Sequence, residues 1–233
     1  MISVVILGNG NVATHLYNAF LKAENIAVSK INSRKLESIP IADVTIIAVS
    51  DDAIADVSKS LNNRNGLITH TSGAVDIDVI VNERKGVFYP LQSFSKDKSV
   101  DFKTIPFCLE TSNSEDYNLL EKLAKSIGKN VFQISSEQRK KLHVAAVFVN
   151  NFSNHMYKIA HDICEKNDVP FEILYPLIEE TAKKIQSISP ENAQTGPAKR
   201  NDVQTIENHL ENLNSQQQKI YKLLSKSIQN SIE

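Results

Sequence analysis

Short apolar runs alternate with helical spacing through the first 135 residues. The runs predict strands at 2–7, 26–31, 43–50, 66–70, 105–110 and 130–134, and residues 86–94 are predicted as a strand that runs into a polar and aromatic loop. Helical spacing predicts helices at 12–20, 53–61, 76–82 and 114–127. Near-continuous apolar strands are typical of a parallel sheet covered on both faces. We therefore predict an α/β fold, in which residues 1–135 form a Rossmann-type, mostly parallel sheet.

Beyond residue 135 the pattern predicts helices only. One long helix is expected to start at Ser135 or Ser136, because its apolar residues recur in steps of three and four. Further helices are predicted at 171–188, ended by Pro190, and at 203–210 and 215–232. These apolar stripes are too thin for a self-contained core. We therefore expect residues 136–233 to form an all-α C-terminal substrate and dimerisation domain that pairs with a second copy, giving a homodimer.

A glycine turn follows the first strand. The chain there reads Gly8, Asn9, Gly10, Asn11 and Val12, and then Ala13, which matches Gly-x-Gly-x-x-Ala. Gly8 permits a sharp turn, and Gly10 lets a pyrophosphate approach the backbone. The unpaired N–H groups at the start of the next helix bind anions. The motif predicts a dinucleotide site, and the alternative is a turn that only uses glycine geometry.

The end of the second strand carries Ser33, Arg34 and Lys35. An NAD site usually places an acidic residue about 20 positions after the glycines, and none is present here. A guanidinium binds a 2′-phosphate in a bidentate manner. We therefore expect NADP as the cofactor, with NADPH preferred over NADH. The alternative is a solvated basic turn.

Polar residues also follow the third and fourth strands. Because ligands of such sheets bind at the carboxyl ends of strands, we expect Val49, Ser50 and Asp51 to line the cofactor crevice. Asp51 or Asp52 is equally suited to capping the next helix. At the following strand end, His70 and Ser72 are candidates for contact with the cofactor. The alternative is a hydrogen-bonded turn.

Composition narrows the range of functions. The net charge is −1 with scattered basic residues, so we expect no nucleic-acid partner. The two cysteines, Cys108 and Cys164, are far apart, which argues against a disulfide framework or a metal site and suits the cytoplasm. We expect no signal peptide and no membrane-spanning segment.

Several motifs together resemble one family. The chain is similar to uncharacterised bacterial proteins, usually called NADP oxidoreductases, that join a Rossmann-like domain to a helical domain of unknown function. In plan these resemble pyrroline-5-carboxylate reductase, deazaflavin-dependent NADP reductase and the β-hydroxyacid dehydrogenases. The matching stretches are Gly8–Ala13, His70–Ala74, Tyr89–Phe94, Leu142–Phe152 and Gly196–Asp202.

The resemblance implies a two-domain subunit, an NADP-type cofactor and a helical dimer, but no known substrate. This chain departs from the family at Tyr89, where His is more common, and at Asn201, where Gly is more common. It also lacks the catalytic Lys that β-hydroxyacid dehydrogenases carry one turn before an Asn. Ala146 and Val147 stand at the corresponding positions before Asn150 and Asn151, so that mechanism does not transfer.

Two residues of the predicted long helix are the catalytic candidates. His143 is suited to donating a proton, because an unperturbed imidazole has a pKa near physiological pH. Asn150 lies two turns later on the same face and is suited to orienting a carbonyl or imine, with Asn151 as the adjacent alternative. A polar patch at a domain interface would explain the same residues.

Further substrate contacts are expected from two other stretches. Gln92 and Ser93 follow the fifth strand. Lys199 and Arg200 lie in a proline-flanked loop and would pair with a substrate carboxylate, unless the loop is merely solvated.

The sequence thus predicts an NADP-dependent oxidoreductase that transfers hydride between the cofactor and a small carbonyl or imine. The alternative is a non-catalytic NADP-binding sensor or scaffold dimer. A weaker third reading is an assembly partner with a vestigial fingerprint.

Overall fold

The structure is a computed structural model that describes residues 1–34, 39–62 and 64–231. It divides into two compact units, Met1–Asn151 and Phe152–Glu233. The sequence pattern places the domain boundary earlier, after residue 135, where helical spacing takes over. The division falls later because the first C-terminal helix is tied by hydrogen bonds to the sheet that precedes it.

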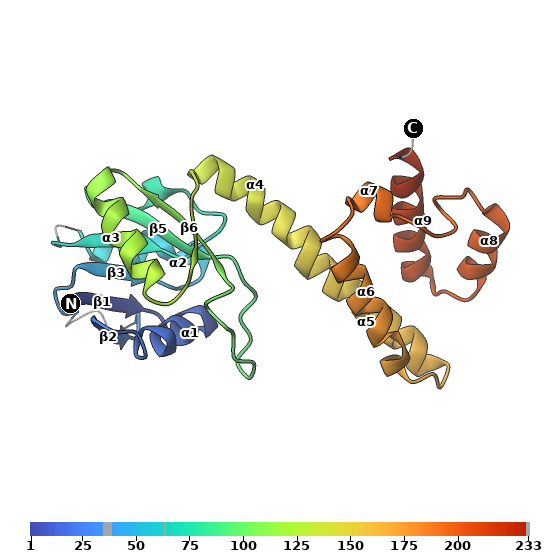
Figure 1. The fold of residues 1–233 in the computed structure, drawn as a ribbon, viewed down its shortest axis with the longest axis horizontal. Helices are drawn as coiled ribbons and strands as arrows, with labels where there is room; N and C mark the ends of the chain where they lie inside the picture. Colours follow the sequence, from blue (N-terminus) through green and yellow to red (C-terminus); the bar gives the residue numbers. More distant parts are fainter. Residues whose placement is uncertain (35–38, 63, 232–233) are drawn as a thin grey trace. The chain divides into compact units, whose positions relative to one another are not determined.

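The N-terminal unit is built on one seven-stranded sheet with the order β2-β1-β3-β4-β5-β6-β7 (Figure 1). Strands β1 to β5 are parallel, β6 is antiparallel to β5, and β7 is parallel to β6. This confirms the predicted Rossmann-type, mostly parallel sheet. The strands are β1 (Ile2–Leu7), β2 (Ile26–Ile31), β3 (Val44–Ile47), β4 (Leu67–His70), β5 (Lys85–Pro90), β6 (Pro106–Thr111) and β7 (Asn130–Gln133).

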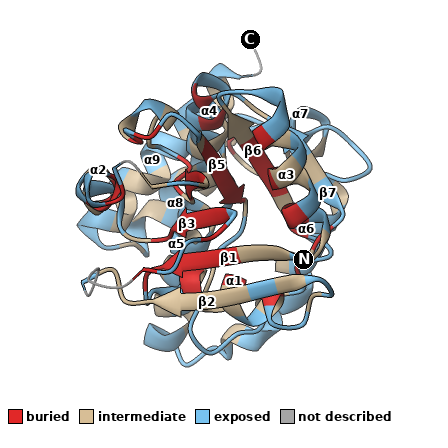
Figure 2. Cartoon of the chain, turned by 90° about the vertical axis from the view of Figure 1, so that its left-hand side faces the viewer, coloured by how far each residue is buried: buried red, intermediate tan, exposed pale blue. Residues whose placement is uncertain are grey.

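Helices cover both faces of this sheet. Alternate residues of a strand point to opposite faces, so Val4 and Ile6 pack in one cluster and Val5 and Leu7 in another. The first cluster includes α1 (Asn11–Phe20) and α3 (Ser114–Lys125), and the second includes α2 (Asp51–Ser60). Figure 2 shows that the buried residues gather on the central strands. Burial on both faces explains why these strands are nearly all apolar.

Two predicted elements of this unit are shorter than expected. The helix expected at 76–82 is a single 3-10 turn, η1 (Ile77–Val79). The strand expected at 43–50 covers only Val44–Ile47. The stretch 86–94, predicted as a strand that runs into a loop, is a strand up to Pro90, whose nitrogen has no proton to continue the ladder. Residues 91–94 therefore leave the sheet and are available to line a site.

Helix α4 (Ser136–Ala146) starts on a buried ion pair. Ser135 caps it in a capping box with Gln138. One turn later the side chain of Arg139, which is fully buried, donates to the carboxylate of Glu110 on β6 and to the carbonyl of Val75. Ser136 also donates to Glu110, from its backbone N–H at 2.8 Å and its hydroxyl at 2.7 Å. These bonds fix the start of α4 on the sheet.

The predicted long helix is not continuous. Helix α4 ends at Ala146, a π-helical segment η2 covers Val147–Phe152, and α5 runs over Ser153–Lys166. A π turn adds a residue to the turn, which changes which later side chains share a face with earlier ones. The apolar spacing of the sequence did not reveal this change.

The remaining elements of the C-terminal unit are all helical, as predicted. They are η3 (Phe171–Leu174), α6 (Tyr175–Lys184), α7 (Pro190–Ala193), α8 (Val203–Glu211) and α9 (Ser215–Asn230). The helix expected at 171–188 is thus split, and Pro190 opens α7 because proline suits the first turn of a helix. Residue 232, the expected end of the last helix, lies outside the described residues.

Few side chains of this unit are buried. Among its described residues Ala198 alone is buried, and large apolar side chains such as Ile173, Leu177 and Leu223 are each more than 60% exposed. Within the described parts of the chain, no helix is long and apolar enough to cross a membrane.

Removal of one partner of the buried ion pair should destabilise the N-terminal unit. Glu110→Gln leaves the buried guanidinium of Arg139 without its counter-charge, so we expect the free energy of unfolding to fall by about 3 kcal/mol. The double variant Glu110→Gln, Arg139→Met removes both charges and should recover part of that loss. Urea unfolding of both single variants and the double variant measures the coupling. Strictly additive effects would contradict it.

The buried imidazole of His70 should make stability depend on pH. Burial, together with the charge of Arg139, lowers the pKa of His70 from 6.5 to about 4. The unfolded chain therefore takes up this proton at higher pH than the folded chain, so stability is retained above pH 6.5 and is lost as the pH falls towards 4. The difference amounts to about 3 kcal/mol.

His70→Asn tests this assignment, because an amide oxygen can still accept the N–H of Ser72 but does not titrate. Urea unfolding at pH 7.5 and pH 4.5 should show a smaller pH-dependent loss in the variant than in the wild type. Parallel losses in the two proteins would assign the acid sensitivity to other groups.

Candidate functional site

The turn between β1 and α1 requires glycine at Gly8. Its φ of +146° is rarely adopted by other residues, and a Cβ there would lie 2.0 Å from the carbonyl oxygen of Ala48. Gly10 has ordinary extended geometry, with φ of −72°, and a Cβ there would meet nothing within 4 Å. Gly8 thus serves the fold, whereas the absence of a side chain at Gly10 leaves open space at the start of α1.

The first turn of α1 faces a cavity of about 790 Å³. Within residues 1–34, 39–62 and 64–231 no side chain caps this helix, and its first turn holds no acidic residue, so its N–H groups present the positive end of the helix dipole. The cavity is lined by Asn9, Gly10, Asn11, Val12, Asn32, Ser33, Arg34, Ala48, Val49, Ser50, Ala53, Val57, Thr71 and Phe94. It extends from the glycine turn to the ends of β2 and β3.

Most of the predicted cofactor residues therefore lie around one cavity. Ser33 and Arg34 are at its β2 end, where the backbone N–H of Arg34 donates to the side chain of Asn32 at 3.0 Å. Gly8 lies in the turn beneath it, and Lys35 lies outside the described residues. Thr71 and Phe94 line the cavity although the sequence did not single them out.

Asp51, His70 and Ser72 are not among the lining residues. Asp51 opens the first turn of α2, where its charge suits the helix dipole, and Ser50 is the N-cap residue. The Nδ1 atom of His70 accepts the N–H of Ser72, whose hydroxyl accepts the N–H groups of Ala74 and Val75. His70 and Ser72 thus form the hydrogen-bonded turn that the sequence left as the alternative.

A second cavity, of about 560 Å³, lies between the end of β5 and α4. It brings together five of the predicted catalytic and substrate residues. Its lining residues are Tyr89, Leu91, Gln92, Ser93, Leu142, His143, Ala145, Ala146, Val147, Val149, Asn150 and Asn151. Apolar side chains form most of this wall, so the few polar groups would determine how a ligand is oriented.

His143 is held against two neighbours on the wall of this cavity. The hydroxyl of Tyr89 lies 3.2 Å from Nδ1 of His143, and the two rings meet edge to face. Burial, with a smaller effect of Cys108, raises the pKa of Tyr89 to about 12, so the phenol stays protonated at neutral pH. Sequence reasoning did not place Tyr89 in the site. Its position at the end of a strand that leads into polar residues was the available signal.

The same loop borders both cavities. Phe94 lines the first cavity, whereas Gln92 and Ser93 line the second. The loop is attached to α1, because Asn11 donates to the carbonyl of Phe94 at 2.9 Å and the Nε2 atom of His15 lies 2.8 Å from the carbonyl oxygen of Ser95. The loop of residues 92–95 therefore joins the glycine turn and α1 to the cavity at His143.

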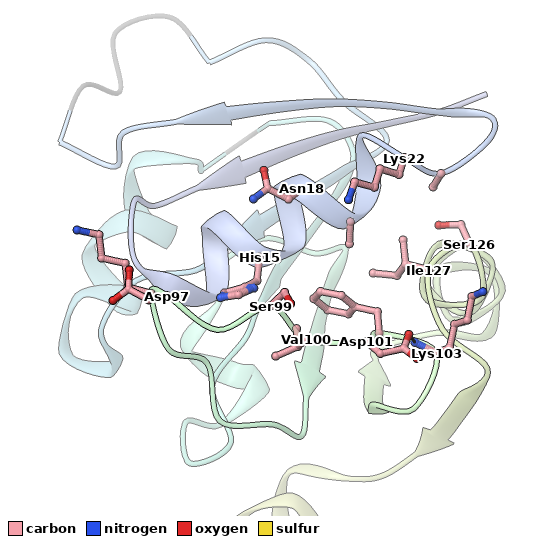
Figure 3. Close-up of a pocket in the computed structure, with 14 residues that line it drawn as sticks. His15, Asn18, Lys22, Asp97, Ser99, Val100, Asp101, Lys103, Ser126 and Ile127 are labelled. Carbon is pink, nitrogen blue, oxygen red and sulfur yellow. Dashed lines mark hydrogen bonds between the residues drawn. The ribbon is translucent and has the colours of Figure 1, made fainter.

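A third cavity, of about 520 Å³, lies along α1 between His15 and Lys22 (Figure 3). Its walls come from α1, from the loop that contains Asp97 and Asp101, and from Ser126 and Ile127 at the end of α3. Its lining includes both lysines and aspartates, so it favours no single class of ligand.

The remaining candidates lie in the C-terminal unit. Lys199 and Arg200 belong to the loop before α8, and the guanidinium of Arg200 lies 4.0 Å from the carboxylate of Asp202, which caps α8. Within the described residues, His161, Asp162 and Glu165 on α5 come close enough to share a metal ion. They are mostly exposed and nothing else points to a metal there.

Comparisons with known proteins support the family resemblance. A family model described as a domain of unknown function (DUF2520) matches residues 105–228. No curated protein matches the chain. Among solved structures, a Bacteroides fragilis protein described as a putative NADP oxidoreductase is 36% identical over 98% of both chains, with a TM-score of 0.87.

More distant structures share the fold. Pyrroline-5-carboxylate reductase from Streptococcus pyogenes is 16% identical over 98% of both chains, with a TM-score of 0.64. A reductive aminase from Aspergillus terreus, solved with NADPH and ethyl levulinate, is 12% identical over 100% of this chain and 94% of its own, with a TM-score of 0.71. With a family model that covers more than half of its length and a close structural relative, this chain belongs to the DUF2520 family.

Proposed function

We propose that this protein is an oxidoreductase that uses NADP(H) to reduce a small carbonyl or imine compound, or to catalyse the reverse reaction. The observation that carries the proposal is the uncapped N-terminus of α1, which opens on a cavity beside the glycine turn. The functions named for the Bacteroides, Streptococcus and Aspergillus proteins are consistent with it.

The glycine turn fits a pyrophosphate. Space is open where a side chain at Gly10 would stand, and no side chain of the described residues accepts from the N–H groups at the start of α1. A doubly charged pyrophosphate would be stabilised there by N–H donors and by the helix dipole. Ser50 and Val49 would line the middle of the bound dinucleotide.

The β2 end of the cavity fits a 2′-phosphate. Ser33 and Arg34 line it, and none of the lining residues described at that end is acidic. A guanidinium would bind the phosphate through charge-assisted hydrogen bonds, whereas the ribose of NADH would gain little from it. This supports a preference for NADPH over NADH.

The second cavity supplies the groups that a carbonyl or imine requires. When bound, the nicotinamide would supply a hydride to the electrophilic carbon. His143 would donate a proton to the oxygen or nitrogen of the substrate, and the side-chain amide of Asn150 or Asn151 would orient it. The apolar wall would exclude water, while Gln92 and Ser93 would contact the rest of the substrate. Contact of Lys199 and Arg200 with a substrate carboxylate stays a prediction.

We also propose that the protein is a homodimer and that it is located in the cytoplasm. The exposed apolar residues of the C-terminal unit support a homodimer formed through its helices, because a unit with almost no buried side chain lacks a core of its own. Cys108 and Cys164 are both free, and burial raises the pKa of the Cys108 thiol to about 11. Free thiols are consistent with the reducing cytoplasm.

Titration with NADPH and NADH tests the cofactor. The wild type should bind NADPH more tightly than NADH. Arg34→Ala should weaken NADPH binding by tenfold or more and leave NADH binding unchanged. A tenfold change in affinity is about the contribution of one charge-assisted hydrogen bond. Lys22→Ala removes one positive charge at the other end of α1 and should change neither affinity.

Equal weakening of NADPH and NADH binding by Arg34→Ala would contradict the 2′-phosphate assignment, and failure to bind either nucleotide would remove the proposed function. NADPH binding without turnover over a broad panel of carbonyl and imine compounds would favour a non-catalytic sensor or scaffold.

Light scattering tests the dimer. The wild type should have twice the 26.0 kDa mass of one chain. Leu177→Asp places a charge on an apolar side chain of α6 that is 63% exposed, and should shift the mass towards that of one chain. Ile41→Asp alters a 79% exposed apolar residue of the N-terminal unit and should leave the mass unchanged. A wild type with the mass of one chain would contradict the dimer.

A further inference from the structure

Gly73 lies directly against the side chains of His143 and Tyr89. A Cβ at Gly73 would lie 2.5 Å from Nδ1 of His143 and 2.8 Å from the phenol carbon Cζ of Tyr89. The φ of Gly73 is not positive, so its backbone does not require glycine. The close approach of the two rings is therefore the reason that a side chain is not tolerated there.

The segment after Gly73 is fastened to α4. Arg139 donates to the carbonyl of Val75, and the N–H of Ile77 donates to the hydroxyl of Ser136 at 3.1 Å. At the surface, the ammonium of Lys140 lies 2.8 Å from the carboxylate of Asp76. Because these bonds hold the loop on the first turns of α4, the imidazole one turn after Arg139 is confined between the glycine and the phenol.

The direction of the hydrogen bond between Tyr89 and His143 depends on which nitrogen of the neutral imidazole holds the proton. The phenol is 9% exposed and keeps its proton, because its pKa is raised to about 12. Its hydroxyl can therefore donate to the lone pair of Nδ1. Among the described residues, no hydrogen bond involves Nε2 of His143, whereas Nδ1 lies against the Tyr89 hydroxyl.

We propose that Tyr89 is a positioning residue that donates to Nδ1 of the neutral His143 and so keeps the imidazole proton on Nε2, and that Gly73 and Tyr89 together hold the ring in place. This inference rests on the proposed function, in which His143 donates a proton to the substrate. To that function the inference adds Tyr89, which selects the tautomer of His143, and Gly73, which leaves room for the imidazole.

The hydroxyl also suits the other protonation state of His143. In the imidazolium both nitrogens carry protons, and the oxygen of Tyr89 can accept from Nδ1–H after its own proton rotates away. When the imidazolium gives its Nε2 proton to the substrate, the ring keeps the proton on Nδ1, and the oxygen of Tyr89 still accepts it. Proton exchange with water, gain at Nε2 and loss at Nδ1, then restores the tautomer to which the hydroxyl donates. A phenylalanine would fill the same volume but would leave Nδ1 without a partner in either state.

Nuclear magnetic resonance of protein with ¹⁵N-labelled histidine tests the tautomer directly, without need of substrate. His143→Gln identifies the signals of His143. In the wild type, at a pH where the ring is neutral, Nδ1 should have the shift of an unprotonated nitrogen and Nε2 that of a protonated one. In Tyr89→Phe the two shifts should move towards each other, because the bond that selects the tautomer is lost.

Tyr117→Phe is the matched control. This variant removes a phenol hydroxyl from α3. The ring of Tyr117 packs in a different apolar cluster from that of Tyr89, so the signals of His143 should stay unchanged. Gly73→Ala is the second variant. The added methyl group should displace the imidazole from Tyr89 and shift the same two ¹⁵N signals. If Tyr89→Phe fails to fold, this variant alone tests whether the contact selects the tautomer. Unchanged His143 signals in a folded Tyr89→Phe or Gly73→Ala would overturn the proposal.

Kinetics then connect the tautomer with turnover. If NADPH-dependent reduction is found, Tyr89→Phe should lower kcat by about tenfold or more with little change in KM, since a general acid contributes about 10²–10⁴-fold and is here misplaced rather than removed. A tenfold loss of kcat/KM that comes only from a higher KM would contradict the proposal that Tyr89 positions His143. Absence of turnover in the wild type would count against the proposed function, whereas the resonance result would still decide the role of Tyr89.

Discussion

The buried ion pair between Arg139 and Glu110 determines where the second cavity lies. It joins α4 to strand β6, and through the carbonyl of Val75 it also joins α4 to the loop that follows β4. A buried charge is tolerated only when its partners surround it, so this geometry has little freedom. His143 follows Arg139 by one turn and Gly73 precedes Val75 by two residues. The contact between imidazole, phenol and glycine is a consequence of that pair.

The two main cavities share one boundary. Residues 92–94 leave the sheet after Pro90 and line both, and Asn11 of α1 holds them by the carbonyl of Phe94. A dinucleotide on the glycine turn would therefore touch the same segment that borders the polar groups around His143. This arrangement fits a reaction in which one end of the cofactor meets a small molecule beside a proton donor.

Local signals predicted much of this, and long-range contacts account for what was missed. The strands and the glycine turn follow from residues close in sequence, so Gly8, Gly10 and the parallel sheet were accessible. The sequence did not single out Arg139, because its partners Glu110 and Val75 are 29 and 64 residues away. Tyr89 was missed for the same reason. The π turn at Val147–Phe152 leaves apolar spacing almost unchanged, so the pattern could not reveal it.

The central claim is that the first turn of α1 binds the phosphates of a dinucleotide, and Gly10→Ala tests it most directly. A Cβ at Gly10 meets no protein atom within 4 Å, so unfolding should change by less than about 1 kcal/mol, the approximate effect of an N-cap substitution. The methyl group would occupy the space of the pyrophosphate, and calorimetric titration should show NADPH affinity reduced tenfold or more. A folded Gly10→Ala that binds NADPH as tightly as the wild type would contradict the account.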